Sequence, residues 1–120
     1  MPFFPDNLPR ALAVAELFCA AAWSDEDLDA DERDQVRKEL TVLLGRLPPD
    51  VDDFVGRYSP RGFDLAVTLT KIHPSGVDEK RALMRGVRAV LRADGAVRET
   101  EAGFLAKVGH ALRIPVTDID

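Results

Sequence analysis

Cysteine is nearly absent from the sequence. Cys19 is the only one among 120 residues, so the chain forms no internal disulfide. Its apolar neighbours predict a buried structural thiol. A run of about 20 uncharged apolar residues, which a membrane-spanning helix requires, is also missing. The apolar segment 11–23 contains Glu16 and follows a single positive charge, Arg10, unlike a secretory signal peptide. We therefore expect a cytoplasmic protein without direct membrane insertion.

Positive charge is scarce and dispersed. The chain has 16 lysines and arginines against 21 aspartates and glutamates, a formal net charge of −5. The basic residues do not cluster, so we expect no nucleic-acid partner. Residues 24–39 contain eight acids and three bases, which gives this segment the same net charge as the whole chain. The acidity of the protein is therefore local.

Residues suited to catalysis are few. Of the two histidines, His73 precedes a proline at a predicted helix end. His110 follows Glu101 by nine residues, which at about 100° per residue places it half a turn away from that carboxylate. The sequence has no phosphate-binding glycine loop and no cluster of histidine and cysteine ligands. We therefore expect no catalytic residues and a protein that is not an enzyme.

The periodicity of the apolar residues is helical throughout. With 46% hydrophobic and 31% charged residues, the chain is typical of a globular protein, and we expect a single domain over residues 1–120. No segment alternates as a strand would. Helices are predicted over 9–23, 29–47, 49–57, 60–72 and 76–93, and in a last segment that contains Phe104 and ends near Arg113.

Particular residues define the ends and faces of these helices. The first helix is expected to be mostly buried, with Arg10 and Glu16 outside its apolar stripe. Ser59 and the proline after it are predicted to cap the fourth helix. Its apolar set includes Phe63 and Val67.

Two acidic segments, 24–32 and 93–101, follow one template. Each has a small residue, then an aspartate, an aliphatic residue three positions later and a glutamate seven positions after the aspartate. These anchors are Asp25, Leu28 and Glu32 in the first copy, and Asp94, Val97 and Glu101 in the second, 69 residues further on. Each copy lies between two helical patterns. The sequence therefore predicts two related helix–acidic turn–helix units.

The acidic positions have a physical cost that points to a ligand. Asp25 and Asp94 fall in the last turn of a helix, where the helix dipole disfavours a carboxylate by about 0.3–1 kcal/mol. If the two units pack about a pseudo-twofold axis, these aspartates and the two glutamates converge and repel one another unless a cation intervenes. Ligation by oxygen alone suits Ca²⁺ or Mg²⁺ and not zinc.

A second interpretation of the acidic turns stays open. Asp29 and Glu32 have the spacing of a capping box, which by itself explains a glutamate in the first helical turn. The matching position before Glu101 is Arg98, a poor cap. The first turn is not an EF-hand, because Ala30 and Val36 stand at the sixth and twelfth positions, where glycine and glutamate are required. The turns are thus either a cation site or helix caps with solvated charge.

The paired units resemble the TerB-like family of tellurite-resistance proteins. The resemblance covers roughly residues 9–114, and the segment 93–101 fits the family motif well, whereas Glu26 replaces the usual glycine of the first motif. The resemblance implies a seven-helix domain whose acidic turns come together and are proposed to bind a divalent cation, most often calcium. It also implies an association with stress responses, chemical-resistance systems and membrane-linked complexes.

The sequence and the resemblance together define our expectations. The fold is expected to be all-α, a compact helical bundle of six to seven helices built from the two related units. The candidate metal ligands, for Ca²⁺ or Mg²⁺, are Asp25, Asp29, Glu32, Asp94 and Glu101. The expected function is a non-enzymatic, cation-binding domain that mediates stress-response or tellurite-resistance-type protein interactions. The alternative is a cation-independent helical interaction module. Neither identifies the protein partner or the oligomeric state.

Overall fold

The computed structural model describes residues 8–22, 30–58, 63–74, 76–91 and 99–114, with the side chains of 99–102 left out. The described residues form six α-helices and no strand, as the all-α prediction requires. The helices are α1 Leu8–Ala22, α2 Ala30–Leu44, α3 Pro49–Arg57, α4 Leu65–Ile72, α5 Gly76–Leu91 and α6 Glu99–Leu112. A seventh helix is not among the described residues.

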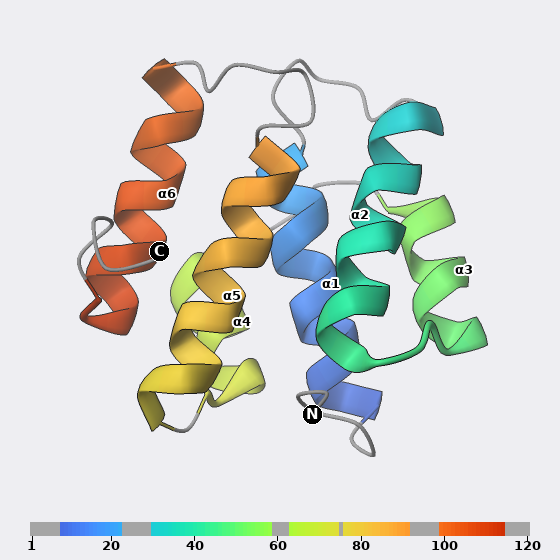
Figure 1. Cartoon of the computed structure of the whole chain (residues 1–120), viewed down its shortest axis with the longest axis horizontal. Helices are drawn as coiled ribbons and strands as arrows, with labels where there is room; N and C mark the ends of the chain where they lie inside the picture. Colours follow the sequence, from blue (N-terminus) through green and yellow to red (C-terminus); the bar gives the residue numbers. More distant parts are fainter. Residues whose placement is uncertain (1–7, 23–29, 59–62, 75, 92–98, 115–120) are drawn as a thin grey trace.

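Helix α1 lies at the centre of the bundle. It packs against α2, α3, α4 and α5, while α6 packs on the outer side of α5 (Figure 1). Nine of its 15 residues are buried, which confirms the prediction of a mostly buried first helix. Hydrophobic burial is the dominant favourable contribution to folding, and α1 shares its buried residues with four neighbouring helices.

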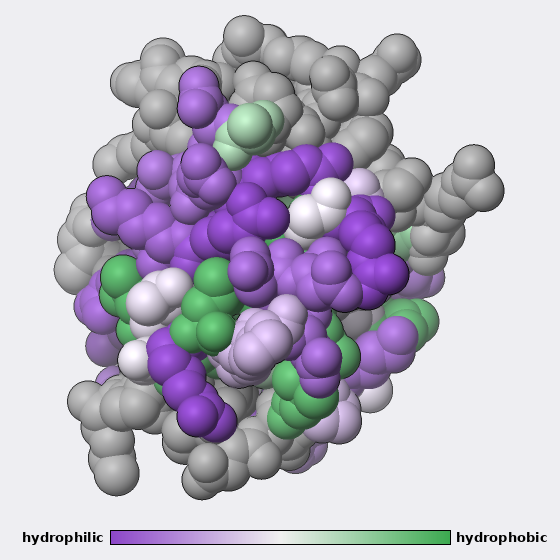
Figure 2. All heavy atoms as spheres, turned by 90° about the vertical axis from the view of Figure 1, so that its right-hand side faces the viewer, coloured by the Kyte–Doolittle hydropathy of each residue, from purple (hydrophilic) through white to green (hydrophobic). Residues whose placement is uncertain are grey.

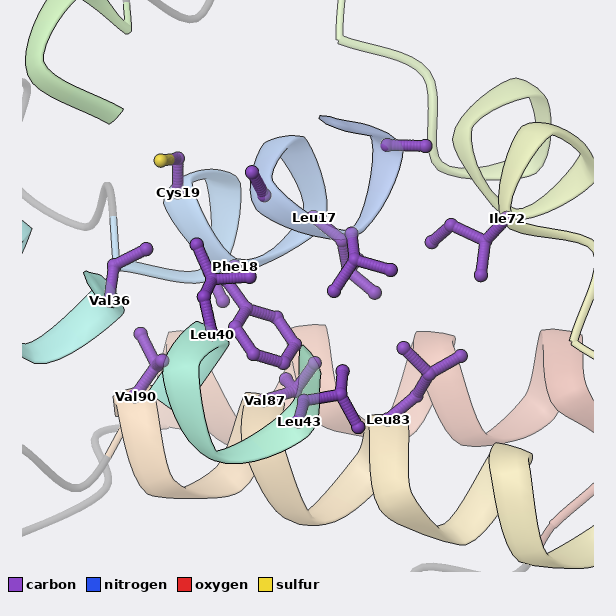
Figure 3. Close-up of a cluster of buried hydrophobic side chains, with 14 of the residues drawn as sticks. Leu17, Phe18, Cys19, Val36, Leu40, Leu43, Ile72, Leu83, Val87 and Val90 are labelled. Carbon is purple, nitrogen blue, oxygen red and sulfur yellow. The ribbon is translucent and has the colours of Figure 1, made fainter. Parts of the chain in front are cut away.

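The core joins α1 to three other helices. Phe18 of α1 points its ring toward α5, next to Val87, while Leu40 of α2 and Ile72 of α4 approach the same cluster (Figure 3). All four side chains are fully buried. Cys19 is buried in the same cluster, and this burial raises the pKa of its thiol from 9.0 to about 12. The predicted buried thiol is confirmed.

Arg10 and Glu16 of α1 were predicted to lie outside the apolar stripe, but both side chains contact another helix or its end. Glu16 is half-buried, and its Oε1 accepts a hydrogen bond of 2.6 Å from the Thr68 hydroxyl in α4. Arg10 is also half-buried, and its Nε donates to the Ile72 carbonyl at 2.6 Å. Because these partners are 52 and 62 residues away, helical periodicity alone does not reveal them.

The boundaries of two helices also differ from the predictions. Helix α2 ends at Leu44 and not beside the prolines, because Gly45 adopts a left-handed φ of 83° and its N–H bonds to the Thr41 carbonyl. Helix α4 begins at Leu65, since the Asp64 side chain caps it by accepting from the Val67 N–H at 3.0 Å.

The predicted inner face of α4 is only partly correct. Phe63 precedes the helix, is half-buried and stacks on Phe104 of α6 with ring centroids 6.4 Å apart. Val67, which we expected among the inward residues, is 51% exposed. Leu69 and Ile72 are buried, as their helical spacing predicts, and the polar Thr68 is buried beside them.

Arginines of α2 hold α3 in place. Arg33 donates hydrogen bonds to the carbonyls of Val55 and Tyr58 at the C-terminal end of α3, where the helix dipole favours a cation. Arg37 forms ion pairs with Asp34 at 2.9 Å and with Asp52 of α3 at 2.6 Å. The short helix α3 is therefore fixed to α2 by charged contacts as well as by burial of Val51 and Val55.

Candidate functional site

Helices lie on both sides of each acidic segment. Helix α1 ends its described part at Ala22 and α2 starts its described part at Ala30, and residues 23–29 between them are not described. In the same way α5 is described to Leu91 and α6 from Glu99, and residues 92–98 are not described. The order of helix, acidic segment and helix agrees with the prediction, while the correspondence of the two units within the turns stays a prediction.

The four helix ends that flank the acidic turns lie at one end of the molecule. The last turns of α1 and α5 and the first turns of α2 and α6 all lie at the top of Figure 1. Two of these ends are N-terminal, where unpaired backbone N–H groups and the helix dipole favour negative charge. The other two are C-terminal, where a carboxylate is disfavoured unless another charge compensates it.

The two candidate glutamates occupy equivalent positions. Glu32 is the third residue of α2 and Glu101 is the third residue of α6. The Glu32 side chain is half-buried, next to Asp31 in the first turn of α2. The side chain of Glu101 is not described. Glu32 lies in the first turn of the described part of α2, and the role of both glutamates as ligands stays a prediction.

The remaining candidate ligands, Asp25, Asp29 and Asp94, lie outside the described residues. Within the described ranges, no group of three or more histidine, cysteine, aspartate or glutamate side chains could hold a metal ion. That result does not bear on the candidate site, since only Glu32 among its five side chains is described. The convergence of these carboxylates on a cation stays a prediction.

A second candidate site, which the sequence analysis did not identify, is a cleft between α1 and α3. Its volume is about 610 Å³. The lining residues combine acidic, aromatic and aliphatic side chains: Leu12, Glu16, Asp50, Asp53, Phe54, Arg57 and Tyr58. We call it the α1–α3 cleft. The spacing of Asp50, Asp53 and Arg57 places them on one side of α3, but only the packing of α1 beside them forms the cleft.

The chemistry of the α1–α3 cleft is mixed. Arg57 pairs with Asp53 one helical turn earlier. The rings of Phe54 and Tyr58 are 5.9 Å apart at an angle of 58°, a tilted aromatic pair. Burial raises the pKa of the Tyr58 hydroxyl to about 12, helped by the nearby Cys19 and Glu16. Tyr58 is therefore neutral at physiological pH.

A comparison with models of protein families shows which family this chain is related to. The model of the family described as "Tellurite resistance protein TerB" matches residues 11–120. The chain belongs to the TerB family. The resemblance drawn from the two acidic motifs is thereby confirmed. No curated protein and no solved structure gave a match.

Membership of the TerB family agrees with the fold. The match includes all of α2 to α6 and α1 from Ala11 onward, so both helical units belong to the TerB region. In the described part of this TerB chain, no helix is long and apolar enough to cross a bilayer. The chain is thus an all-α domain of the tellurite-resistance type.

Proposed function

We propose that the chain binds a divalent cation, Ca²⁺ or Mg²⁺, at its two acidic turns and acts without catalysis of its own. The ligands are Asp25, Asp29, Glu32, Asp94 and Glu101. Binding ties the α1–α2 unit to the α5–α6 unit and so stabilises one arrangement of the bundle for a protein partner. The proposal includes a single domain over residues 1–120, a cytoplasmic location and a role in stress-response or tellurite-resistance-type interactions.

The observation that supports this proposal most is the position of the helices beside the two acidic segments. The described parts of α1 and α5 end, and those of α2 and α6 start, at the same end of the bundle. Carboxylates on two such turns would repel one another, and a cation removes that repulsion. Carboxylate and carbonyl oxygens are the ligands that Ca²⁺ and Mg²⁺ prefer.

The competing function is a cation-independent interaction module. The α1–α3 cleft favours this function. It offers a binding surface between two helices, and none of its lining residues is a candidate metal ligand. In that case the acidic turns are helix caps and solvated charge. The two functions differ in one respect that can be measured directly, the dependence on a divalent ion.

Calorimetric titration of the chain with Ca²⁺ and with Mg²⁺ tests the proposal. We expect Asp94→Asn and Glu101→Gln each to weaken the affinity at least about tenfold, since each removes a charged ligand. The matched controls are Asp34→Asn and Glu39→Gln, which remove acids of α2 outside the repeated template. Asp34 pairs with Arg37, and Glu39 accepts a hydrogen bond from Gln35. Both controls should keep the affinity within about twofold. Equal affinity in all four variants would contradict the assigned site.

A further inference from the structure

We propose that the α1–α3 cleft is a docking site for a partner segment that presents a cationic side chain, arginine or lysine, beside an apolar one. The proposal concerns the interaction part of the proposed function and does not depend on a cation at the acidic turns. It rests on the shape, the charge and the aromatic content of the cleft, all of which come from described residues.

The charge of the cleft favours a cation. Glu16, Asp50 and Asp53 supply three carboxylates against one guanidinium, that of Arg57, so the lining has a formal charge of −2. Arg57 is already paired with Asp53. Asp50 is exposed in the first turn of α3 and forms no ion pair with any residue in the described ranges. It is thus available to an incoming positive charge.

Glu16 gives the cleft a fixed acidic group. Its Oε1 accepts the 2.6 Å hydrogen bond from Thr68, which is itself buried and anchored on α4. The carboxylate is half-buried, so a cation beside it is less screened than one beside a surface acid. The acids of α3 add charge at the opposite wall of the cleft.

The apolar lining favours an organic cation with an apolar neighbour. Leu12 and Phe54 are half-buried and pack against the core while still lining the cleft. Phe54 is half-buried, and its ring packs at a tilt against the buried Tyr58. The exposed part of Phe54 offers an aromatic surface of the kind that attracts guanidinium and ammonium groups. Phe54 is only partly covered by the protein itself, so a partner that covers it gains hydrophobic contact.

Other classes of ligand fit less well. A bare metal ion is excluded from the cleft, since no three acidic side chains of the described residues are placed to hold one. Nucleic acid and anionic lipid would be repelled by the carboxylates and by the chain's net charge of −5. Figure 2, which views the side of the molecule where α2 and α3 lie, shows hydrophilic residues over most of this face with smaller hydrophobic areas between them. A mixed surface of this kind suits an amphipathic basic peptide.

The test is a titration of the ¹⁵N-labelled full chain, in EDTA, with a blocked hexapeptide of alternating leucine and arginine. A hexapeptide of alternating leucine and glutamate is the matched probe. We expect the arginine peptide to shift the amide resonances of Leu12 and Phe54 and the glutamate peptide to leave them unchanged. Because EDTA removes divalent ions, failure of this titration and failure of the cation site are distinguishable.

Variants separate docking in the cleft from general charge attraction. Asp50→Asn with Asp53→Asn should weaken binding of the arginine peptide about fivefold, as expected for the loss of two exposed charge pairs. The control is Asp78→Asn, another exposed aspartate in the first turn of a helix, here α5, and it should change the affinity less than twofold. The charge reversal Asp50→Lys should shift preference toward the glutamate peptide, which a loss of folding would not do.

Three results would overturn the proposal. The first is equal binding of the two peptides, and the second is a set of shifted resonances that excludes Leu12 and Phe54. The third is binding of the arginine peptide only after deletion of residues 1–7, because the cleft would then belong to the chain's own N-terminal segment and not to a partner.

Discussion

At the residue scale, Gly86 sets the distance between α5 and α1. A Cβ added there would lie 2.3 Å from Cζ of Phe18, whose ring is fully buried in the core. We expect Gly86→Ala to lower the free energy of unfolding by about 1–3 kcal/mol through overpacking. The higher helix propensity of alanine, up to about 1 kcal/mol, offsets part of this loss. Urea denaturation measures the difference.

Gly103→Ala is the control for this substitution. Gly103 is exposed in α6, and an added Cβ would have no atom within 4 Å. Alanine should therefore raise the free energy of unfolding by up to about 1 kcal/mol. If both variants gained stability to the same degree, the close contact between Gly86 and Phe18 would be refuted.

At the element scale, Arg10 connects α1 to the turn between α4 and α5. Its guanidinium donates to the carbonyls of Ile72 at 2.6 Å and His73 at 2.9 Å, and pairs with Glu79 at 3.3 Å. Lysine carries its N–H groups on one nitrogen and cannot reproduce the forked geometry of a guanidinium. Arg10→Lys should cost about 1–3 kcal/mol of stability, with faster hydrogen exchange in α4 as the local measure.

The control for this prediction is Arg46→Lys, an exposed arginine beyond the end of α2. Its replacement should change the free energy of unfolding by no more than about 0.5 kcal/mol. A loss of stability of the same size in both variants would mean that the forked contact of Arg10 adds nothing.

Each of the six helices among the described residues was predictable, and some of their ends were not. Apolar periodicity and the prolines located α3 correctly at Pro49–Arg57. The predicted start of α4 at Pro60 was wrong, because the Asp64 side chain caps the helix by accepting from the Val67 N–H. The side-chain partners of Arg10 and Glu16 were also missed, since they come from helices more than 50 residues away.

At the scale of the whole molecule, the repeat in the sequence predicted a helix before and a helix after each acidic segment. The described helices α1 and α2 lie on either side of the first segment, and α5 and α6 on either side of the second. The α1–α3 cleft could not be predicted in this way, because its two walls are separated by α2 in the sequence. The shape of such a cleft depends on the packing angle between two helices, and the local sequence pattern does not predict that angle.

The central claim, a cation bound between the two units, concerns the stability of the whole bundle. An ion that binds only the folded chain stabilises it by about 2.7 kcal/mol at 100 times its dissociation constant. For a chain of 120 residues this corresponds to a shift of several degrees in the melting temperature. Without a cation, Asp94→Asn should stabilise the chain slightly, because the sequence predicts that this charge falls at the C-terminal end of a helix, where the helix dipole disfavours it.

The most direct measurement is a thermal melt of the chain in EDTA and again in millimolar Ca²⁺ or Mg²⁺. We expect the melting temperature to rise by several degrees with one of the ions, and Asp94→Asn to abolish that rise. Asp34→Asn should retain it. A melting temperature that is the same in EDTA and with either ion would contradict the cation site and leave the acidic turns as helix caps and solvated charge.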